Sequence, residues 1–367
     1  MLNNTLATIS FAVVLGISVA QADITVTSWG GAYTNSQQKA YGKPWEKKTG
    51  NRITWANYNV DDYNSTLDEI RAQVKDGVLT WDIMDVLPDN AVIGCDEGLF
   101  EELPFDKFIQ APDGTPMIMD MMVPPVSNCA APQIFWSYVV FFDKTKYTED
   151  TGPKSMADFY DIKKFPGKRG IHSWASANIE MALVADGVEP NKVYDVMSTK
   201  EGMDRAFAKL DTIKGDVVFW SNGSQPLELV KSGEVVMALA YNGYIGAAIL
   251  TKNQPFEIVW DGQVLVPEYL VMVKGTKNYK EALDFMIFAS APEQQAGQAK
   301  WINYGPIRKS GLDIIAANEP FFFNGQNIMP YMPNRKEVMT RSVIADPNWW
   351  LDNGAKLIGR FAAWMGD

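Results

Sequence analysis

Residues 24–31 read Ile-Thr-Val-Thr-Ser-Trp-Gly-Gly, a pattern that predicts a strand running into a tight turn. Ile24 and Val26 alternate with threonines, as expected of a strand with one buried face. A helical pattern follows from about residue 33 to 48, and apolar runs at 52–58 and 81–87 flank a second helical pattern. Strand, helix, strand, helix and strand in succession predict an α/β fold built on a parallel sheet.

The middle of the chain reads as a second unit of the same kind. Extended apolar runs occur at 134–142 and 235–241, and helical patterns lie between them. The segment 264–273 reads as extended but contains Pro267, which we expect in a segment passing between lobes rather than in a central strand. The chain is longer than one hydrophobic core usually supports, so we expect two lobes.

The first residues have the pattern of an export signal. Residues 6–20 carry no charge, and Ala20-Gln21-Ala22 fits the small-residue rule for cleavage. We therefore expect residues 1–22 to be a signal peptide cut after Ala22, with the mature chain in the periplasm. An uncleaved membrane anchor is the alternative, but the run is shorter than the roughly 20 residues that span a bilayer.

The charge of the chain limits the classes of partner that it can bind, and its cysteine content indicates a disulfide. The formal net charge of −11 argues against nucleic acid as a partner and is compatible with a cationic ligand. Cys95 and Cys129 are the two cysteines of the chain. In an oxidising compartment such a pair predicts one disulfide, and two buried free thiols are the alternative.

The sequence offers little that could carry catalysis. His172 is the single histidine, no G-x-S-x-G turn or phosphate-binding loop occurs, and no His/Cys spacing suits a metal. Neighbouring acids such as Asp61-Asp62 and Asp82 with Asp85 could serve a carboxylate-dependent hydrolase. We expect these acids to be solvated loop residues, and therefore a protein that is not an enzyme and uses no cofactor or metal.

Several short motifs follow one another in an order typical of one protein family: Ser28-Trp29-Gly30-Gly31-Ala32-Tyr33, Lys47-Lys48-Thr49-Gly50, Trp81-Asp82-Ile83, Ala238-Leu239-Ala240-Tyr241-Asn242-Gly243, Glu281-Ala282-Leu283-Asp284-Phe285 and Ile302-Asn303-Tyr304-Gly305-Pro306. Over nearly its whole length the mature chain resembles the periplasmic spermidine/putrescine-type solute-binding proteins of ABC transporters. The resemblance implies two α/β lobes of the type II periplasmic-binding fold, joined by crossing strands. It also implies a ligand in the cleft between the lobes, a membrane permease as partner, and a monomer.

From this resemblance we expect lobe 1 to comprise residues 23–133 and 268–330, and lobe 2 to comprise residues 134–267 and 331–367. Aromatic positions of the family's ligand site match Trp29, Tyr33, Tyr241 and Tyr304. Glu268 matches the acid on the strand between the lobes, and a salt bridge at the hinge is its alternative role.

Two motifs depart from the family. After the third strand the chain reads Leu87-Pro88-Asp89, where the family has Ser-x-Tyr; Asp89 is a candidate ligand contact or a helix cap. In the second lobe it reads Ser173-Trp174-Ala175-Ser176-Ala177, where the family places two acids. Trp174 therefore becomes a further candidate for the site.

Loss of two acids should weaken the binding of an amine with three N–H donors, because unpaired buried donors are costly. A methylated onium group has no such donors and binds to aromatic faces. The sequence therefore predicts a small quaternary ammonium or sulfonium solute, such as a betaine or dimethylsulfoniopropionate. Donors for its carboxylate would come from His172, Ser221 or Asn222. A polyamine is the alternative ligand, and a secreted carboxylate-dependent hydrolase is a remote alternative function.

Overall fold

The computed structural model describes residues 23–58, 65–147 and 150–366. The expected signal peptide with its cut after Ala22 lies outside the described residues, as does the pair Asp61-Asp62. Within the described ranges no helix has both the length and the apolar character needed to cross a bilayer.

One mixed sheet runs through the whole molecule. Its main path has the order β2-β1-β3-β8-β4-β7-β5-β6, while β10 pairs with β8 and β9 pairs with β4. The pairings among β1, β2 and β3, and among β5, β6 and β7, are parallel, whereas those that involve β4 and β8 in the centre are mostly antiparallel. The strands are β1 Asp23–Ser28, β2 Arg52–Asn57, β3 Ile83–Val86, β4 Ala130–Asp143, β5 Arg169–His172, β6 Val217–Trp220, β7 Met237–Tyr241, β8 Phe256–Met272, β9 Gly305–Pro306 and β10 Val343–Ile344.

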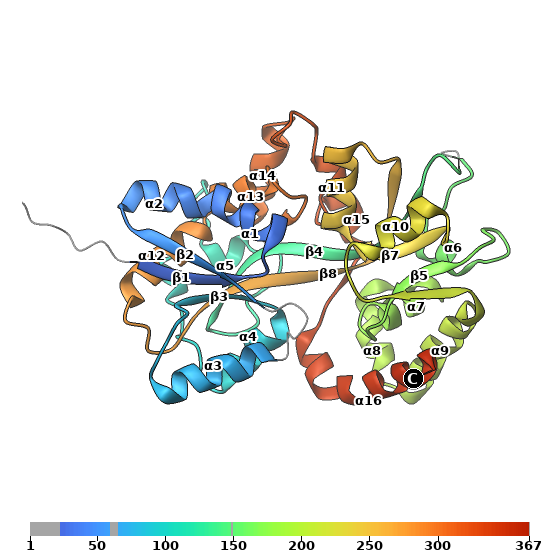
Figure 1. Ribbon diagram of the computed structural model, residues 1–367, viewed down its shortest axis with the longest axis horizontal. Helices are drawn as coiled ribbons and strands as arrows, with labels where there is room; N and C mark the ends of the chain where they lie inside the picture. Colours follow the sequence, from blue (N-terminus) through green and yellow to red (C-terminus); the bar gives the residue numbers. More distant parts are fainter. Residues whose placement is uncertain (1–22, 59–64, 148–149, 367) are drawn as a thin grey trace, which may run out of the picture.

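The long strands β4 and β8 join the two halves of the molecule. In Figure 1 they run side by side from the half that holds β1, β2 and β3 to the half that holds β5 and β7. The protein is therefore a two-lobed α/β molecule, as expected.

Pro267 lies in a strand that passes between the lobes, as expected, but that strand is also central to the sheet, which was not expected. It lies inside β8, opposite Phe135, in a strand that is central to the sheet. On the edge of β8 away from β4, β10 pairs with residues 264–265 and β3 pairs with residues 269–272. Residues 266–268 have no strand partner on that edge, so a proline without an N–H is tolerated there.

Helices pack on both faces of the sheet (Figure 1). They are α1 Gly31–Gln37, α2 Lys43–Thr49, α3 Ser65–Asp76, α4 Pro88–Asp96, α5 Met117–Asp120, α6 Met156–Tyr160, α7 Asn178–Ala185, α8 Val193–Met197, α9 Lys200–Asp211, α10 Gln225–Ser232, α11 Asn242–Lys252, α12 Tyr279–Ala289, α13 Pro292–Ala299, α14 Lys309–Ala317, α15 Lys336–Met339 and α16 Pro347–Met365.

The helix expected after β1 contains one irregular turn. A π-helical segment, Gln38–Gly42, joins α1 to α2, and Pro44 occupies the first turn of α2. Proline disrupts the hydrogen bond and the packing of a regular helix, and a wider turn is one way to accommodate it. The helix ends at Gly50, which adopts the left-handed conformation with φ 80°.

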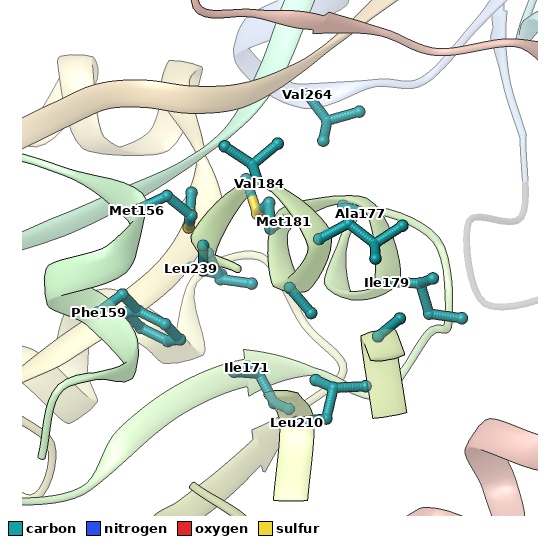
Figure 2. Packing of buried hydrophobic residues seen from close by; sticks show 14 of the residues in the cluster. Met156, Phe159, Ile171, Ala177, Ile179, Met181, Val184, Leu210, Leu239 and Val264 are labelled. Atoms are coloured by element: carbon teal, nitrogen blue, oxygen red, sulfur yellow. The ribbon is translucent and has the colours of Figure 1, made fainter. Parts of the chain in front are cut away.

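Each half has its own hydrophobic core. In the half that holds β5 and β7, side chains from α6, α7 and α9 meet the sheet, with Phe159, Met181, Leu210 and Leu239 all buried (Figure 2). The other half buries residues of β1, β3 and α12 together, including Val26 and Phe285. The residue boundaries of the lobes stay a prediction.

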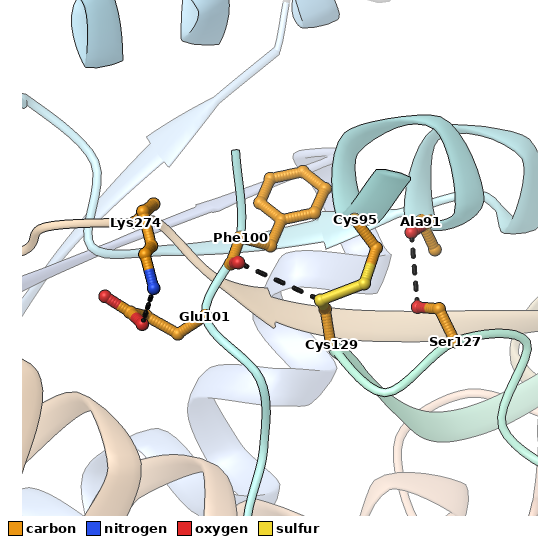
Figure 3. Close-up of a disulfide and its surroundings, with 7 residues drawn as sticks. All are labelled: Ala91, Cys95, Phe100, Glu101, Ser127, Cys129 and Lys274. Atoms are coloured by element: carbon orange, nitrogen blue, oxygen red, sulfur yellow. Dashed lines mark hydrogen bonds and ion pairs between the residues drawn. A yellow bond between two sulfur atoms is a disulfide. The ribbon is translucent and has the colours of Figure 1, made fainter. Parts of the chain in front are cut away.

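Cys95 and Cys129, the pair identified in the sequence, are joined by a disulfide with a Cα–Cα distance of 5.8 Å. Figure 3 shows that the bridge ties the end of α4 to the loop that leads into β4. Beside it, the Ser127 hydroxyl donates a hydrogen bond to the carbonyl of Ala91 at 3.3 Å. The bridge therefore fixes α4, which begins directly after β3, against the start of a strand shared by both lobes.

Candidate ligand-binding site

Strand register places two carboxyl groups next to each other at the centre of the sheet. Asp85 of β3 pairs with Leu270 of β8, and Glu268 lies two residues from Leu270 along the same strand. Residues two apart on a strand share a face, so Asp85 and Glu268 are diagonal neighbours on one face of the sheet. Both are buried, with exposed fractions of 0% and 2%. We call them the carboxyl pair.

Three neutral groups donate hydrogen bonds to Asp85. They are the Trp29 indole N–H at 3.3 Å, the Tyr33 hydroxyl at 3.0 Å and the Gln37 amide. The Ser28 hydroxyl donates to Oε1 of Gln37 at 2.6 Å, which turns the amide nitrogen of Gln37 toward Asp85. The Trp-Gly-Gly turn and the first helix thus supply the donors, which explains why this motif sits at the end of β1.

Glu268 is less well satisfied. The Trp136 indole donates to its Oε2 at 2.7 Å, whereas Oε1 has no hydrogen-bond donor among the described residues. None of the ion pairs in the described part of the chain includes either member of the carboxyl pair. The negative charge of the pair is therefore surrounded by neutral donors alone.

Burial governs the titration of the carboxyl pair. Desolvation raises the pKa of Asp85, and hydrogen bonds from Tyr33, Glu268, Gln37 and Trp29 counteract part of that rise. Desolvation and then the charge of Asp85 raise the pKa of Glu268 well above its ordinary value. Two carboxyls in contact do not both ionise readily. The raised pKa of Glu268 favours its protonated form beside the Asp85 carboxylate.

Aromatic rings continue from the carboxyl pair toward the second lobe. The Trp136 ring lies 5.5 Å from that of Tyr241 and 5.2 Å from that of Tyr138. Tyr33 contacts Tyr304 with ring centroids 5.7 Å apart. A Cβ atom at Gly243 would lie 2.6 Å from the Tyr304 ring, so glycine is required for this close approach. Trp136 therefore bridges the carboxyl pair and Tyr241.

His172 orients the hydroxyl group of Tyr241. Its Nδ1 accepts a hydrogen bond from the Trp174 backbone N–H at 2.9 Å, which leaves the proton of the neutral ring on Nε2. Burial lowers the pKa of His172 to about 4, so the ring is neutral at pH 7. Nε2 lies 3.5 Å from the Tyr241 hydroxyl, and the Tyr138 hydroxyl donates to the same oxygen at 3.5 Å. Tyr241 thus accepts from two neighbours and keeps its own O–H proton available to a ligand.

The turn that carries Trp174 is held under backbone strain. Ala177, before the first residue of α7, has φ 66°, a conformation that costs of order 1–3 kcal/mol for a residue with a side chain. The Asn178 amide donates to the carbonyls of His172 and Trp174 at 2.8 and 2.6 Å and so ties the turn together. The Trp174 side chain itself is 51% exposed.

The structure brings some of the predicted residues together and leaves others apart. Trp29, Tyr33 and Glu268 meet at the carboxyl pair, with Tyr304 in contact with Tyr33. Tyr241 and His172 lie beyond Trp136, and Trp174 follows them.

Two further predicted residues, Asp89 and Asn222, lie near the N-termini of helices. Asp89 lies in the first turn of α4, and Asn222 caps its own loop by accepting a hydrogen bond from the Ser224 backbone at 3.0 Å.

Sequence reasoning missed three residues of the carboxyl-pair region, Asp85, Gln37 and Trp136. Asp82 and Asp85 were expected to be solvated, and this was wrong, since both are buried. Asp82 directly precedes β3 and accepts a hydrogen bond from the backbone of Thr25, whereas Asp85 lies within β3 and faces Glu268. Strand alternation beside the predicted site was the signal that could have identified Asp85. Among the described residues, no group of three or more His, Cys, Asp or Glu could hold a metal ion.

The comparisons with known proteins agree with this arrangement. Residues 40–320 match the family model described as "Bacterial extracellular solute-binding protein". This chain belongs to that family. The family's members are solute-binding proteins of transporters and not enzymes, which confirms our expectation of a non-enzymatic solute-binding protein of an ABC transporter.

Named relatives cover nearly the full chain. A gamma-aminobutyric acid-binding protein from Pseudomonas aeruginosa is 38% identical over 342 residues, which are 93% of this chain and 90% of the relative. A solved ABC transporter substrate-binding protein from Bradyrhizobium japonicum is 30% identical, with a TM-score of 0.79, over 94% of this chain and 100% of that one. A solved receptor for gamma-aminobutyric acid is 29% identical, with a TM-score of 0.74, over 94% of this chain and 97% of that one.

As a member of the family, the protein has a small-molecule ligand and a membrane permease as partners. Membership also agrees with the periplasmic location expected from the sequence. The cleavage position and the monomeric state stay predictions.

Proposed function

We propose that this solute-binding protein delivers a small ω-amino acid of the gamma-aminobutyric acid class to its permease. The observation that supports this proposal is the buried carboxyl pair, Asp85 and Glu268, which neutral donors alone surround. Ionised carboxylates in a protein interior require a compensating partner. The ligand's ammonium group is that partner.

The ammonium end fits the unsatisfied atom of the pair. A primary ammonium has three N–H donors, and Oε1 of Glu268 has no donor in the ligand-free protein. Hydrogen bonds to charged groups contribute about 1.5–3 kcal/mol each. The half-buried rings of Trp29 and Tyr33, which already donate to Asp85, flank the same carboxyls and keep water away from the ammonium group.

The carboxylate end of the ligand faces the second lobe. Tyr241 lies next to Trp136, whose indole bonds to Glu268, and its hydroxyl proton is available because the hydroxyl oxygen accepts from two neighbours. An O–H donor to a carboxylate is a strong, charge-assisted hydrogen bond. A ligand with ammonium and carboxylate at opposite ends therefore spans from the carboxyl pair to Tyr241.

This arrangement favours an amino acid over the onium solute predicted from the sequence. A quaternary ammonium or sulfonium group has no N–H donor, so it cannot form hydrogen bonds with Asp85 or with Oε1 of Glu268. A polyamine would place a second ammonium near Tyr241 and His172, whose hydroxyl and neutral ring carry no negative charge to balance it.

A thermal-shift and calorimetric panel tests the proposal. Gamma-aminobutyric acid, its shorter and longer ω-amino acid homologues, glycine betaine, dimethylsulfoniopropionate, spermidine and putrescine would each be added to the mature protein. An ω-amino acid at about 100 times its Kd should add roughly 2.7 kcal/mol of stability. Stabilisation by betaine or dimethylsulfoniopropionate alone, or by the polyamines alone, would refute the ω-amino acid assignment.

A further inference from the structure

The carboxyl pair has too few donors to exist as two carboxylates in the ligand-free protein. Asp85 receives three hydrogen bonds from neutral groups and Glu268 receives one, from Trp136. The remaining oxygen, Oε1 of Glu268, becomes satisfied when it carries a proton and donates it to Asp85. In the ligand-free protein the carboxyl pair therefore holds one proton between Asp85 and Glu268, the two groups that would accept hydrogen bonds from the proposed ligand.

We propose that the ligand's ammonium group displaces this proton, so that each binding event exchanges one cation for another at the carboxyl pair. This inference rests on the proposed function, because it requires a ligand with an ammonium group. The O–H bond of Glu268 breaks and its proton passes to the buffer. N–H bonds of the ammonium then donate to Glu268 and Asp85, and the pair ends as two carboxylates around one cation.

Other titratable groups near the site do not supply the proton. Among the described residues, the titratable side chains whose pKa values respond to the charge of the pair are tyrosines, and burial raises those pKa values above the ordinary value: Tyr33, Tyr41, Tyr58, Tyr269 and Tyr304. They stay protonated at neutral pH. Burial lowers the pKa of His172 to about 4, so this ring carries no exchangeable charge above pH 5. Asp82, directly before β3, receives its hydrogen bonds from the Thr25 backbone, Thr276 and Asn278.

The exchange predicts a particular pH dependence. The pKa values of the pair are raised on folding, so the pair still holds its proton above the ordinary carboxyl range of about 4. Binding releases a proton, and affinity should therefore rise with pH by up to about tenfold for each pH unit while the empty pair is protonated. It should become constant once the empty pair has lost its proton. The amine of the ligand, like that of lysine with a pKa of about 10.4, stays charged throughout this range.

Glu180 provides a matched control. It is a second buried acid with a pKa raised by desolvation, and one of its oxygens also lacks a hydrogen-bond partner among the described residues. Its other oxygen accepts from Tyr194 at 3.0 Å and from Trp350 at 2.7 Å, on the far side of α7 against α8 and α16. If lobe closure released protons from buried acids in general, Glu180 would contribute to the release. The proposed exchange releases a proton from the carboxyl pair alone.

The test is titration calorimetry with gamma-aminobutyric acid at pH 6 to 7 in buffers of different ionisation enthalpy. The slope of the observed enthalpy against the buffer enthalpy should give release of about one proton for the wild-type protein and for Glu180→Gln. Glu268→Gln has the same shape without the acidic proton, and its slope should fall to near zero at ligand concentrations that compensate for weaker binding. A thermal melt of each variant checks that it is folded.

A second measurement needs no ligand. Infrared difference spectra of the ligand-free protein, wild type minus Glu268→Gln, should contain the C=O stretch of a protonated carboxyl group near neutral pH. Absence of that band would overturn the proposal whatever the ligand is. Binding of gamma-aminobutyric acid without buffer dependence would overturn the exchange and leave the proposed function standing. Failure of every amino acid in the panel to bind would overturn both.

Discussion

Asp82 and Asp85 are two buried acids three positions apart, one directly before β3 and one within it, and their amide variants should separate ligand binding from folding. Asp85→Asn removes one of the two charges that face the proposed ammonium, whereas Asp82→Asn changes an acid directly before β3 that is bonded to Thr25 and Asn278. Each substitution preserves side-chain size. Any effect on affinity that arises from general disturbance of β3 should therefore appear in both variants.

The expected loss for Asp85→Asn follows from the geometry. Two unit charges 4 Å apart attract by about 4 kcal/mol at an effective dielectric constant of 20. Part of this is offset, because the variant also loses the repulsion between Asp85 and Glu268. We expect a net loss of about 2–3 kcal/mol, which is about 30–150-fold in Kd. The new amide N–H₂ would also meet donors from Tyr33 and Gln37, so a modest fall in stability should accompany it.

Asp82→Asn should behave differently. Asp82 accepts hydrogen bonds from the Thr25 backbone at 2.7 Å and from Asn278 at 3.2 Å, contacts that join β1, β3 and the start of α12. Weakening them should lower the free energy of unfolding by about 1–3 kcal/mol and leave the Kd for gamma-aminobutyric acid nearly unchanged. Calorimetry gives Kd, and urea unfolding gives stability. A Kd for Asp85→Asn within about threefold of wild type, or equal losses in both variants, would refute the reasoning.

Three further predictions concern the rest of the site and the fold. Replacing Cys95 and Cys129 by Ala opens a loop of 34 residues and should lower the free energy of unfolding by about 4 kcal/mol in urea titrations, and reduction of the wild-type protein should have the same effect. Tyr241→Phe keeps the ring but removes the donor, so the binding free energy should weaken by about 1–3 kcal/mol, and an unchanged Kd would exclude the hydroxyl from the site. His172 has a pKa of about 4 when folded, below its unfolded value, so it contributes stability that is lost as pH falls below about 6.5. Its contribution should fall by about 2 kcal/mol between pH 7 and 5, and His172→Asn should remove that part of the pH dependence of unfolding.

Local patterns in the sequence were sufficient for the fold. Alternation at Ile24 and Val26 and the helical spacing after Gly31 gave the α/β order, because those periods are properties of single elements. The disulfide could be predicted because Cys95 and Cys129 allow one pairing. Pro267 was misjudged because local propensity disfavours a central strand, and only the gap between β10 and β3 makes the position tolerable.

The acidic part of the site could not be found in this way. Burial of Asp85 depends on the register of β3 against β8, two segments far apart in the sequence. Trp136 lies in an apolar run and reads as a core residue, yet its indole N–H serves Glu268. The aromatic positions Trp29, Tyr33, Tyr241 and Tyr304 were identified through resemblance. The hydrogen bonds from Trp29 and Tyr33 to Asp85 could not be predicted, because they depend on the same strand register.

Glu268 lies on β8, which continues without interruption from one lobe into the other. Any rotation that parts the lobes must bend this strand, and displacement is smallest at the pivot and grows along the lever arm toward the rim. Under the proposed function, the carboxyl pair that holds the ammonium end should therefore move less than Tyr241 and Trp174. Unloading at the permease would then proceed in order, with the carboxylate end freed first and the ammonium end last.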